Sequence, residues 1–360
     1  NNIMDVRIEQ TKQTKKIPTS EELGRIHFGT VFTDHMLRID YDEGRGWHDA
    51  QITPYGPLSL DPAASCLHYG QLIFEGMKAY RHKDGRIVMF RPDMNMKRMN
   101  VSCDRMCIAP IDEKGMLDAI SELVKTDAAW VPGAPGTSLY VRPFIFASEA
   151  FLGVHPSKSF AFVTILSPVG AYFKEGLAPV RIYVEDKYVR AVRGGTGFAK
   201  CAGNYAGSLK SQEEADAAGY SQVLWLDGAE REYIEEVGGM NIFFVIDGEV
   251  VTPELNGSIL PGVTRNSVIE VTKSWGMPMK ERKISIQELA EAYKSGKTQE
   301  AFCTGTAAVV SPIGELKWKE TVMRFNDGRI GGVTQKLYDE ITGIQTGAIP
   351  DRFGWLYTVR

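Results

Sequence analysis

Lys200 lies in the stretch Gly194-Gly195-Thr196-Gly197-Phe198-Ala199-Lys200-Cys201-Ala202-Gly203-Asn204-Tyr205, among glycines and small uncharged residues. Such neighbours remove part of the hydration of an ammonium group, which lowers its pKa and makes the amine a usable nucleophile. An amine of this kind forms Schiff bases with carbonyl compounds. On local composition alone, however, a solvated lysine in a glycine-rich surface loop is the favoured interpretation.

The glycines around Lys200 match neither common nucleotide-binding pattern. A P-loop requires a glycine directly before its lysine and a serine or threonine directly after it. Here Ala199 precedes the lysine and Cys201 follows it. In a dinucleotide-binding fingerprint, the third glycine would fall on Lys200 itself. Nucleotide binding through this loop is therefore not expected.

Arg91 stands at the end of a predicted β-hairpin, in which strands over 77–81 and 86–90 are joined by a turn that contains Gly85. Pro92 follows, and proline suits the first position of a helix. A guanidinium at a strand end can bind a phosphate group in bidentate fashion, although a surface ion pair would also explain it.

Two other backbone segments offer donors for an anion. Residues 261–264, Pro-Gly-Val-Thr, precede a predicted helix that runs to about residue 275. The N–H groups and dipole of a helix start suit phosphate, but most helix starts bind nothing. The second segment is a predicted turn over 304–308, which offers backbone N–H groups and the Thr306 hydroxyl.

Polar side chains in predicted strands can be assigned to faces, because side chains alternate along a strand. Tyr140 and Arg142 share one face of a strand over 138–143. An ordinary half-exposed pair would show the same spacing. The adjacent carboxylates Glu235 and Glu236 face opposite ways on another strand.

Composition limits the function classes. The chain has 360 residues, of which 43% are hydrophobic, and its net charge is −4 with a pI of about 6.0. This length predicts two domains, and the mild negative charge gives no footprint for nucleic acid or an anionic membrane. The five cysteines are scattered, which predicts reduced thiols and a cytoplasmic protein. Cys103 and Cys107 lie one helical turn apart without a nearby histidine, so no metal site is predicted.

The order of predicted elements suggests an α/β (α+β) protein with two domains. The N-terminal domain covers 1–167, a linker rich in glycine and proline covers 168–180, and the C-terminal domain covers 181–360. The polar residues 1–20 contain no signal-peptide core and are predicted to form a flexible arm. The chain does not begin with methionine, which suggests that an N-terminal segment is missing.

Several motifs occur in a specific order along the chain. Besides the lysine stretch, they are His68-Tyr69, Phe74-Glu75-Gly76, Phe90-Arg91-Pro92, Tyr140-Val141-Arg142-Pro143, Glu236-Val237-Gly238-Gly239-Met240-Asn241, Leu260-Pro261-Gly262-Val263-Thr264-Arg265 and Gly305-Thr306-Ala307. In this order, from about residue 28 to 355, the chain resembles the branched-chain amino acid aminotransferases. These are pyridoxal 5′-phosphate enzymes of fold type IV, with a fold like that of D-amino acid aminotransferase.

The resemblance implies a role for each matching residue. Lys200 would be the catalytic Schiff-base lysine, Glu236 would keep the pyridine nitrogen of the cofactor protonated, and Tyr205 would bind its O3′. The remaining cofactor-binding residues would be Arg91, Arg190, Val263, Thr264 and Thr306, mainly around the phosphate. The substrate would be bound by Phe28, Tyr69, Phe74, Tyr140, Arg142, Gly305, Thr306 and Ala307.

The resemblance also implies the reaction and the partners. Amino groups would pass reversibly from L-leucine, L-isoleucine or L-valine to 2-oxoglutarate in a ping-pong cycle. An apolar pocket favours such side chains by about 0.8 kcal/mol per buried CH₂ group. A homodimer is expected, with Tyr69 near the partner chain, and neither nucleic acid nor membrane is expected as a partner.

The chain departs from some relatives at two places. Ala308 and Ser311 occupy the positions of a redox-active Cys-x-x-Cys pair, so thiol regulation there is not expected. Gly239 replaces a threonine beside the pyridine ring, which puts one cofactor hydrogen bond in doubt. Two alternatives remain: a D-amino acid aminotransferase or aminodeoxychorismate lyase of the same fold type, and a non-catalytic sensor of amino acids or cofactor.

Overall fold

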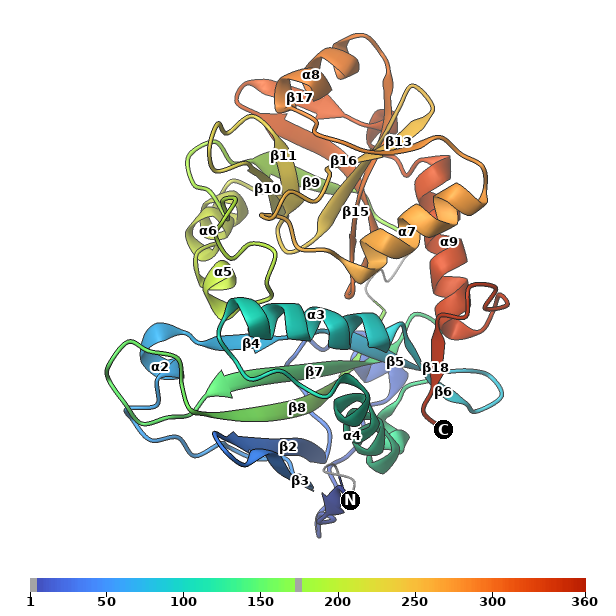
Figure 1. Cartoon of the computed structure of the whole chain (residues 1–360). Coiled ribbons are helices and arrows are strands. Elements are labelled where there is room, and N and C mark those ends of the chain that lie inside the picture. Colours follow the sequence, from blue (N-terminus) through green and yellow to red (C-terminus); the bar gives the residue numbers. More distant parts are fainter. Residues whose placement is uncertain (1–4, 172–176) are drawn as a thin grey trace. The chain divides into compact units, whose positions relative to one another are not determined.

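The computed structural model describes residues 5–171 and 177–360 (Figure 1), which form two compact units. The first unit comprises Asn1–Lys174, Ala199–Ala202 and Ile344–Arg360, and the second comprises Glu175–Phe198 and Gly203–Gly343. The structure thus assigns Lys200 and the C-terminal segment to the first unit, which differs from the predicted division. Residues 172–176 of the predicted linker lie outside the described residues, so the linker stays a prediction.

The first unit is built on a nine-stranded sheet in its described part, with the order β1-β3-β2-β8-β7-β5-β6-β18 and with β4 beside β7. Its strands are β1 (Arg7–Ile8), β2 (His35–Asp42), β3 (Gly46–Pro54), β4 (Leu72–Phe74), β5 (Met77–Arg81), β6 (Ile87–Phe90), β7 (Ser138–Ala147), β8 (Ser159–Val169) and β18 (Leu356–Thr358). Its helices are α1 (Ser20–Leu23), α2 (Cys66–Tyr69), α3 (Pro92–Arg105), α4 (Glu113–Thr126) and the 3-10 turn η1 (Ala128–Trp130). The predicted hairpin is confirmed as the antiparallel pair β5–β6, and α3 begins at Pro92 as predicted.

The main core of the first unit lies between this sheet and helices α3 and α4. Met77 and Ala79 of β5 and Leu139 and Val141 of β7 belong to this core, which also contains Met96, Met99, Cys103, Met116, Ile120 and Leu123 from the helices. Because side chains alternate along a strand, the intervening residues of β5 and β7 face the other side of the sheet. That opposite face carries the polar side chains of the candidate site.

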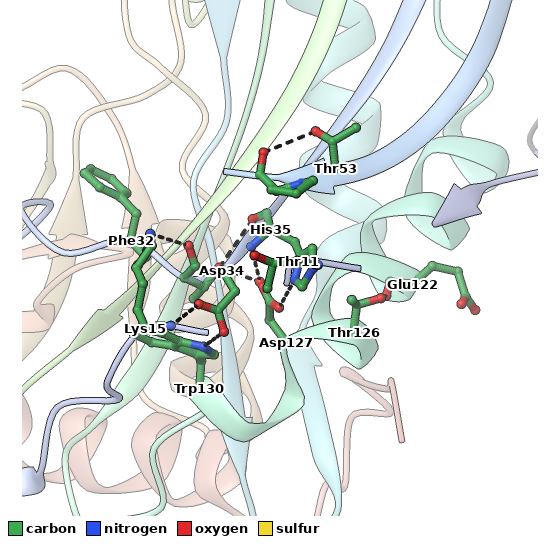
Figure 2. Close-up of polar contacts among 12 residues, drawn as sticks. Thr11, Lys15, Phe32, Asp34, His35, Thr53, Glu122, Thr126, Asp127 and Trp130 are labelled. Atoms are coloured by element: carbon green, nitrogen blue, oxygen red, sulfur yellow. Dashed lines mark hydrogen bonds and ion pairs between the residues drawn. The ribbon is translucent and has the colours of Figure 1, made fainter. Parts of the chain in front are cut away.

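The N-terminal arm docks on the first unit, so the prediction of a flexible arm is wrong for its described residues. The Thr11 N–H donates to His35 Nε2 at 2.9 Å, and His35 Nδ1 lies 2.7 Å from Asp127 Oδ1 (Figure 2). Since Nε2 accepts, Nδ1 carries the ring proton and donates to the carboxylate. The Lys15 N–H donates to Asp34 Oδ1 at 2.8 Å. These contacts anchor the start of the chain on β2.

The second unit contains another nine-stranded sheet in its described part, with the order β11-β10-β9-β16-β15-β12-β13-β14 and with β17 beside β16. The strands are β9 (Val180–Val184), β10 (Gln222–Leu226), β11 (Ile234–Val237), β12 (Asn241–Ile246), β13 (Glu249–Thr252), β14 (Met279–Glu281), β15 (Thr298–Gly305), β16 (Val309–Trp318) and β17 (Thr321–Arg324). The helices are α5 (Ala202–Ala206), α6 (Leu209–Ala217), α7 (Val263–Ser274), α8 (Ile286–Lys294), α9 (Gly332–Thr346) and the turn η2 (Asn326–Gly328).

The helix predicted to begin at Tyr205 is interrupted, which corrects the sequence prediction. It divides into α5 and α6 at Gly207 and Ser208. The Ser208 hydroxyl donates to the Tyr205 carbonyl at 2.7 Å, so this carbonyl has a local partner, and glycine is a poor helix former. Tyr205 therefore lies in a single helical turn of its own rather than at the start of a long helix.

All five cysteines are free thiols. Across residues 5–171 and 177–360, no helix combines the length and apolar character needed to cross a bilayer.

Candidate active site

The Lys200 segment is fixed by its backbone. The Lys200 N–H donates to Ser102 Oγ at 2.9 Å, and the Lys200 carbonyl accepts from the Phe74 N–H at 3.0 Å. Cys201 forms a β-bridge with Ile73. The side chain projects from this anchored backbone, with Nζ 4.8 Å from the centre of the Phe74 ring. The amine predicted to be catalytic therefore lies at a defined place against an aromatic ring.

Four of the predicted substrate residues form one cluster with this lysine. The Arg142 guanidinium carbon lies 4.5 Å from the centre of the Phe74 ring, and Arg142 Nη2 donates to Tyr140 Oη at 2.9 Å. Phe28 packs edge-on against Tyr140, with the ring centroids 4.9 Å apart. Aromatic faces hold a guanidinium by cation–π attraction. The cluster therefore presents an apolar wall that carries a single guanidinium.

Arg142 has a donor that the described protein does not satisfy. Its Nε is buried and has no hydrogen-bond partner among the described residues. A buried donor without an acceptor costs about 1–3 kcal/mol, so such atoms mark places where an acceptor belongs. In a binding site, the carboxylate of a ligand can serve as that acceptor.

Gly76 permits the position of Tyr140. A Cβ atom at Gly76 would lie 2.2 Å from Tyr140 Oη, far inside van der Waals contact. The glycine in the Phe-Glu-Gly motif is therefore required by the close approach of a tyrosine on a neighbouring strand. The sequence contained this motif but not the reason for its glycine.

Sequence reasoning missed the residues that support this cluster from α3. Asn95, Arg98 and Ser102 are buried on one side of the helix. Arg98 binds the fully buried Glu75 with two hydrogen bonds, of 2.9 and 2.7 Å, and Asn95 Nδ2 donates to the same carboxylate at 2.9 Å. The signal was present, because positions i, i+3 and i+7 form a polar stripe on an otherwise apolar helix face.

Lys78 is a second residue that sequence reasoning missed. It is buried on β5, directly opposite Tyr140 in the register of β5 and β7. Burial withdraws the ammonium group from water and lowers the pKa of Lys78 to about 8. A titratable amine therefore stands behind the wall that Tyr140 forms.

Arg91 and Tyr69 lie elsewhere in the first unit. Arg91 caps α3 in the left-handed backbone region, with φ 49°, and its guanidinium carbon lies 4.5 Å from the centre of a Trp355 ring. The Tyr69 hydroxyl donates to the carbonyl of Leu152. These contacts do not involve the residues of the Lys200 cluster, so the roles predicted for Arg91 and Tyr69 stay predictions.

In the second unit, Glu236 and Arg190 form a buried ion pair. Arg190 Nε lies 3.1 Å from Glu236 Oε2, and the Leu260 N–H donates to Glu236 Oε1 at 2.6 Å. The two other nitrogens of Arg190 donate to the carbonyls of Ser258 and Gly197 at 3.0 and 3.1 Å. A guanidinium and a backbone N–H stabilise the charged form of a carboxylate. Glu236 is therefore held as a carboxylate within the unit.

Glu235 binds different partners, as its place on the strand predicted. Asn256 Nδ2 donates to Glu235 Oε2 at 3.0 Å, and the Ser258 hydroxyl donates to the same oxygen. The two adjacent carboxylates thus separate into one that binds Arg190 and one that binds the loop before α7.

The second unit also carries the two backbone segments expected to bind an anion. Val263 and Thr264 occupy the first turn of α7, which Gly262 caps without a side-chain hydrogen bond. Gly305 ends β15, and Thr306 and Ala307 lie in the turn that leads to β16. The N–H groups of a helix start and of a tight turn are donors suited to phosphate.

Backbone strain is present beside this turn. Val309 has φ 62°, a left-handed conformation that is rare for a β-branched residue. A three-residue hairpin loop ends in such a residue, and glycine usually fills that position. Strained residues of this kind gather at functional sites. In the same unit, a Cβ atom at Gly239 would lie 3.8 Å from Tyr205 Cε1, so this glycine approaches the tyrosine ring.

Comparison with known proteins agrees with this arrangement. The family described as amino-transferase class IV matches residues 72–316, and this is the class that the fold and the lysine site define. Branched-chain-amino-acid aminotransferase 2 of Bacillus subtilis (strain 168) is 57% identical over 97% of this chain and 96% of its own length. The chain therefore belongs to the branched-chain amino acid aminotransferase family, as its motifs predicted.

Solved structures confirm the predicted fold type. The branched-chain amino acid aminotransferase of Escherichia coli matches with a TM-score of 0.75 at 28% identity, and the match covers 89% of this chain and 99% of that chain. A second solved branched-chain amino acid aminotransferase, from the source abbreviated T.th. and with pyridoxamine 5′-phosphate, matches with a TM-score of 0.74 at 27% identity, over 89% of this chain and 98% of that chain.

Proposed function

We propose that this chain transfers amino groups reversibly between branched-chain L-amino acids and 2-oxoglutarate, in a ping-pong cycle that uses pyridoxal 5′-phosphate. The observation that carries the proposal is the anchored Lys200 amine beside a guanidinium with an unsatisfied N–H. A protein that only binds amino acids does not require such a lysine. Membership of the aminotransferase family supports the same conclusion.

The residues present fit the cofactor. Lys200 supplies the amine, and Glu236 supplies a buried carboxylate that favours a protonated pyridine nitrogen. Arg91, Val263, Thr264 and Thr306 supply donors for the phosphate, and Tyr205 supplies a hydroxyl. Bound pyridoxal phosphate acts as an electron sink for charge that develops at the substrate Cα. Arg190 acts on Glu236, whose charge it stabilises.

The chain's own side chains then have distinct tasks. The Lys200 amine takes the proton from the substrate Cα and returns it in the reverse direction, as a positioned general base and acid. Arg142 binds the substrate carboxylate through the N–H that lacks a protein acceptor. Phe28, Phe74 and Tyr140 exclude water and favour an aliphatic side chain. Candidate donors for the second carboxylate of 2-oxoglutarate are Arg142, Tyr69 and the backbone of Gly305–Ala307.

A visible absorption spectrum tests the cofactor and the first half-reaction. The protein loaded with pyridoxal phosphate is expected to show a yellow band that bleaches on addition of L-leucine. Bleaching by D-alanine and not by leucine would favour a D-amino acid aminotransferase. Lys200→Ala is expected to remove both the bleaching and the turnover while its circular dichroism spectrum stays unchanged. Turnover like that of the wild type would disprove the assignment of the lysine.

A homodimer is the proposed assembly, and an exposed apolar patch supports it. The patch consists of Leu67, Tyr69, Phe151, Leu152 and Val154, all of which are exposed. The hydrogen bond from Tyr69 to Leu152 joins its two segments. A cluster of exposed large apolar side chains is typical of a protein interface, and family resemblance places Tyr69 near a second copy.

Light scattering tests this assembly. Val154 is 81% exposed in the chain alone, so Val154→Asp is not expected to unfold the protein. The wild type is expected to have the mass of a dimer, and this variant is expected to shift toward the monomer. The matched control Val322→Asp changes another exposed valine, at 42%, and should leave the mass unchanged. A fully active wild-type monomer would refute the assembly. Five free thiols support the further proposal that the enzyme works in the reducing cytoplasm.

A further inference from the structure

A cavity of about 190 Å³ lies in the second unit, on the side of β11 that Glu235 faces. Its inner lining includes Ile234, Glu235, Ser258 and Ile259, all of which are buried. Its outer lining includes the exposed residues Arg193, Ala229, Glu230 and Lys283. The cavity therefore has an apolar base with one carboxylate and a charged mouth.

Glu235 offers a free acceptor to this cavity although only 4% of the residue is exposed. Both hydrogen bonds that it receives, from Asn256 and Ser258, reach Oε2. Among the described residues, none donates to Oε1, and this oxygen is also absent from the fully buried atoms that lack a partner. It therefore keeps exposed surface, and the cavity that Glu235 lines provides it.

The charges around the cavity are not paired with one another. Asp227, Glu230, Glu235 and Glu254 line it together with Arg193 and Lys283, and no ion pair joins any of these six in the described part of the chain. Asp227 is accounted for, because the N–H groups of Glu230, Glu232 and Tyr233 donate to it. A buried carboxylate that lacks a cationic partner is costly, so a cationic ligand would stabilise it.

We propose that this cavity is a second binding site, distinct from the cofactor site, for a small aliphatic α-amino acid. The ammonium group binds Glu235 Oε1 at the base, and the aliphatic side chain contacts Ile234 and Ile259. The carboxylate of the ligand binds Arg193 and Lys283 at the mouth. The volume suits a molecule of this size, and a charge at each end matches a zwitterion.

The site is connected to the residues proposed to hold the cofactor. The Ser258 hydroxyl binds Glu235, and the Ser258 carbonyl accepts from Arg190 Nη1 at 3.0 Å. Arg190 in turn binds Glu236. A ligand on Glu235 therefore acts on the loop that positions Arg190, and its binding is expected to change the affinity for pyridoxal phosphate. This consequence, unlike the binding itself, rests on the proposed role of Glu236.

Isothermal titration calorimetry tests the binding. The protein is the holoenzyme reduced with sodium borohydride, in which the bond from Lys200 to the cofactor is permanent and leucine cannot react. L-leucine is the probe, and isobutylamine, which lacks the carboxylate, is the second probe. Glu235→Gln keeps the shape of the side chain and removes its charge, and Ala229→Trp fills the mouth from an exposed position. Glu213→Gln removes a charge from an exposed residue of α6 and serves as the matched control.

The expected result is leucine binding in the wild type and in Glu213→Gln, at least tenfold weaker binding in Glu235→Gln, and loss of this binding in Ala229→Trp. Isobutylamine should bind at least tenfold more weakly than leucine. Equal leucine binding in the wild type and Glu235→Gln, with both folded by circular dichroism, would overturn the proposal. So would binding of isobutylamine without binding of leucine. Bleaching of the unreduced Glu235→Gln enzyme by leucine tests the proposed function separately.

Discussion

Arg190 is the residue whose replacement tests the geometry of the second unit most directly. Its side chain is 7% exposed, and its three N–H directions reach Glu236, Ser258 and Gly197. Lysine keeps the positive charge but has a single ammonium group on a flexible stem. Arg190→Lys therefore preserves one ion pair at best and leaves two buried carbonyls without their charged donor.

The size of the effect follows from these contacts. A hydrogen bond to a charged group contributes roughly 1.5–3 kcal/mol, and two such bonds are lost. Water and the lysine ammonium replace part of them, so we expect the free energy of unfolding to fall by about 3 kcal/mol. The affinity for pyridoxal phosphate is expected to fall at least tenfold, because Glu236 is then held less firmly.

Urea denaturation of the apoprotein measures the first effect, and titration of the apoprotein with pyridoxal phosphate measures the second. Arg181→Lys is the matched control, because the Arg181 side chain is 54% exposed and its ion pair with Glu315 has a distance of 3.0 Å. An exposed pair contributes about 0–1 kcal/mol, so the control should unfold much like the wild type. Equal unfolding curves for Arg190→Lys and Arg181→Lys would refute the reasoning.

Two further predictions concern the first unit. Gly76→Ala places a methyl group 2.2 Å from Tyr140 Oη, so we expect the KM for leucine to rise at least tenfold with a smaller change in kcat; an unchanged KM would contradict the role of this glycine. Lys78 has its pKa lowered by burial from 10.5 to about 8, so between these pH values the unfolded chain holds a proton that the folded chain lacks. This difference is expected to add about 3 kcal/mol to the free energy of unfolding as the pH rises from 8 to 10.5. Lys78→Met should remove that rise in urea denaturation, and equal slopes in the two proteins would exclude it.

Local sequence patterns predicted the elements well where neighbouring residues decide the structure. The hairpin β5–β6 and the start of α3 at Pro92 follow from turn residues and from the fixed φ of proline. The alternation along β7 correctly placed Tyr140 and Arg142 on one face, where they share a hydrogen bond. Ordered motifs also led to the family, because they recorded several requirements of one reaction.

Contacts between distant residues were not available to this reasoning. The N-terminal arm is polar and lacks a periodic pattern, yet it docks through His35 and Asp127, which are 92 residues apart. Gly76 looked like any turn glycine until Tyr140 lay against it on another strand. Such contacts depend on which strands pair and in which register, and short-range patterns do not encode that choice.

The sequence by itself thus determined the identities of the chemical groups, namely the lysine amine, the carboxylate pair and the arginines, together with the strand faces they occupy. Only the tertiary structure decided their partners. Lys200 is anchored by Ser102, which is 98 residues away, and the charge of Glu236 is balanced by Arg190 from another segment. The physical reason is that a side chain's type and face depend on local backbone geometry, whereas its partners depend on the packing of segments far apart in the chain.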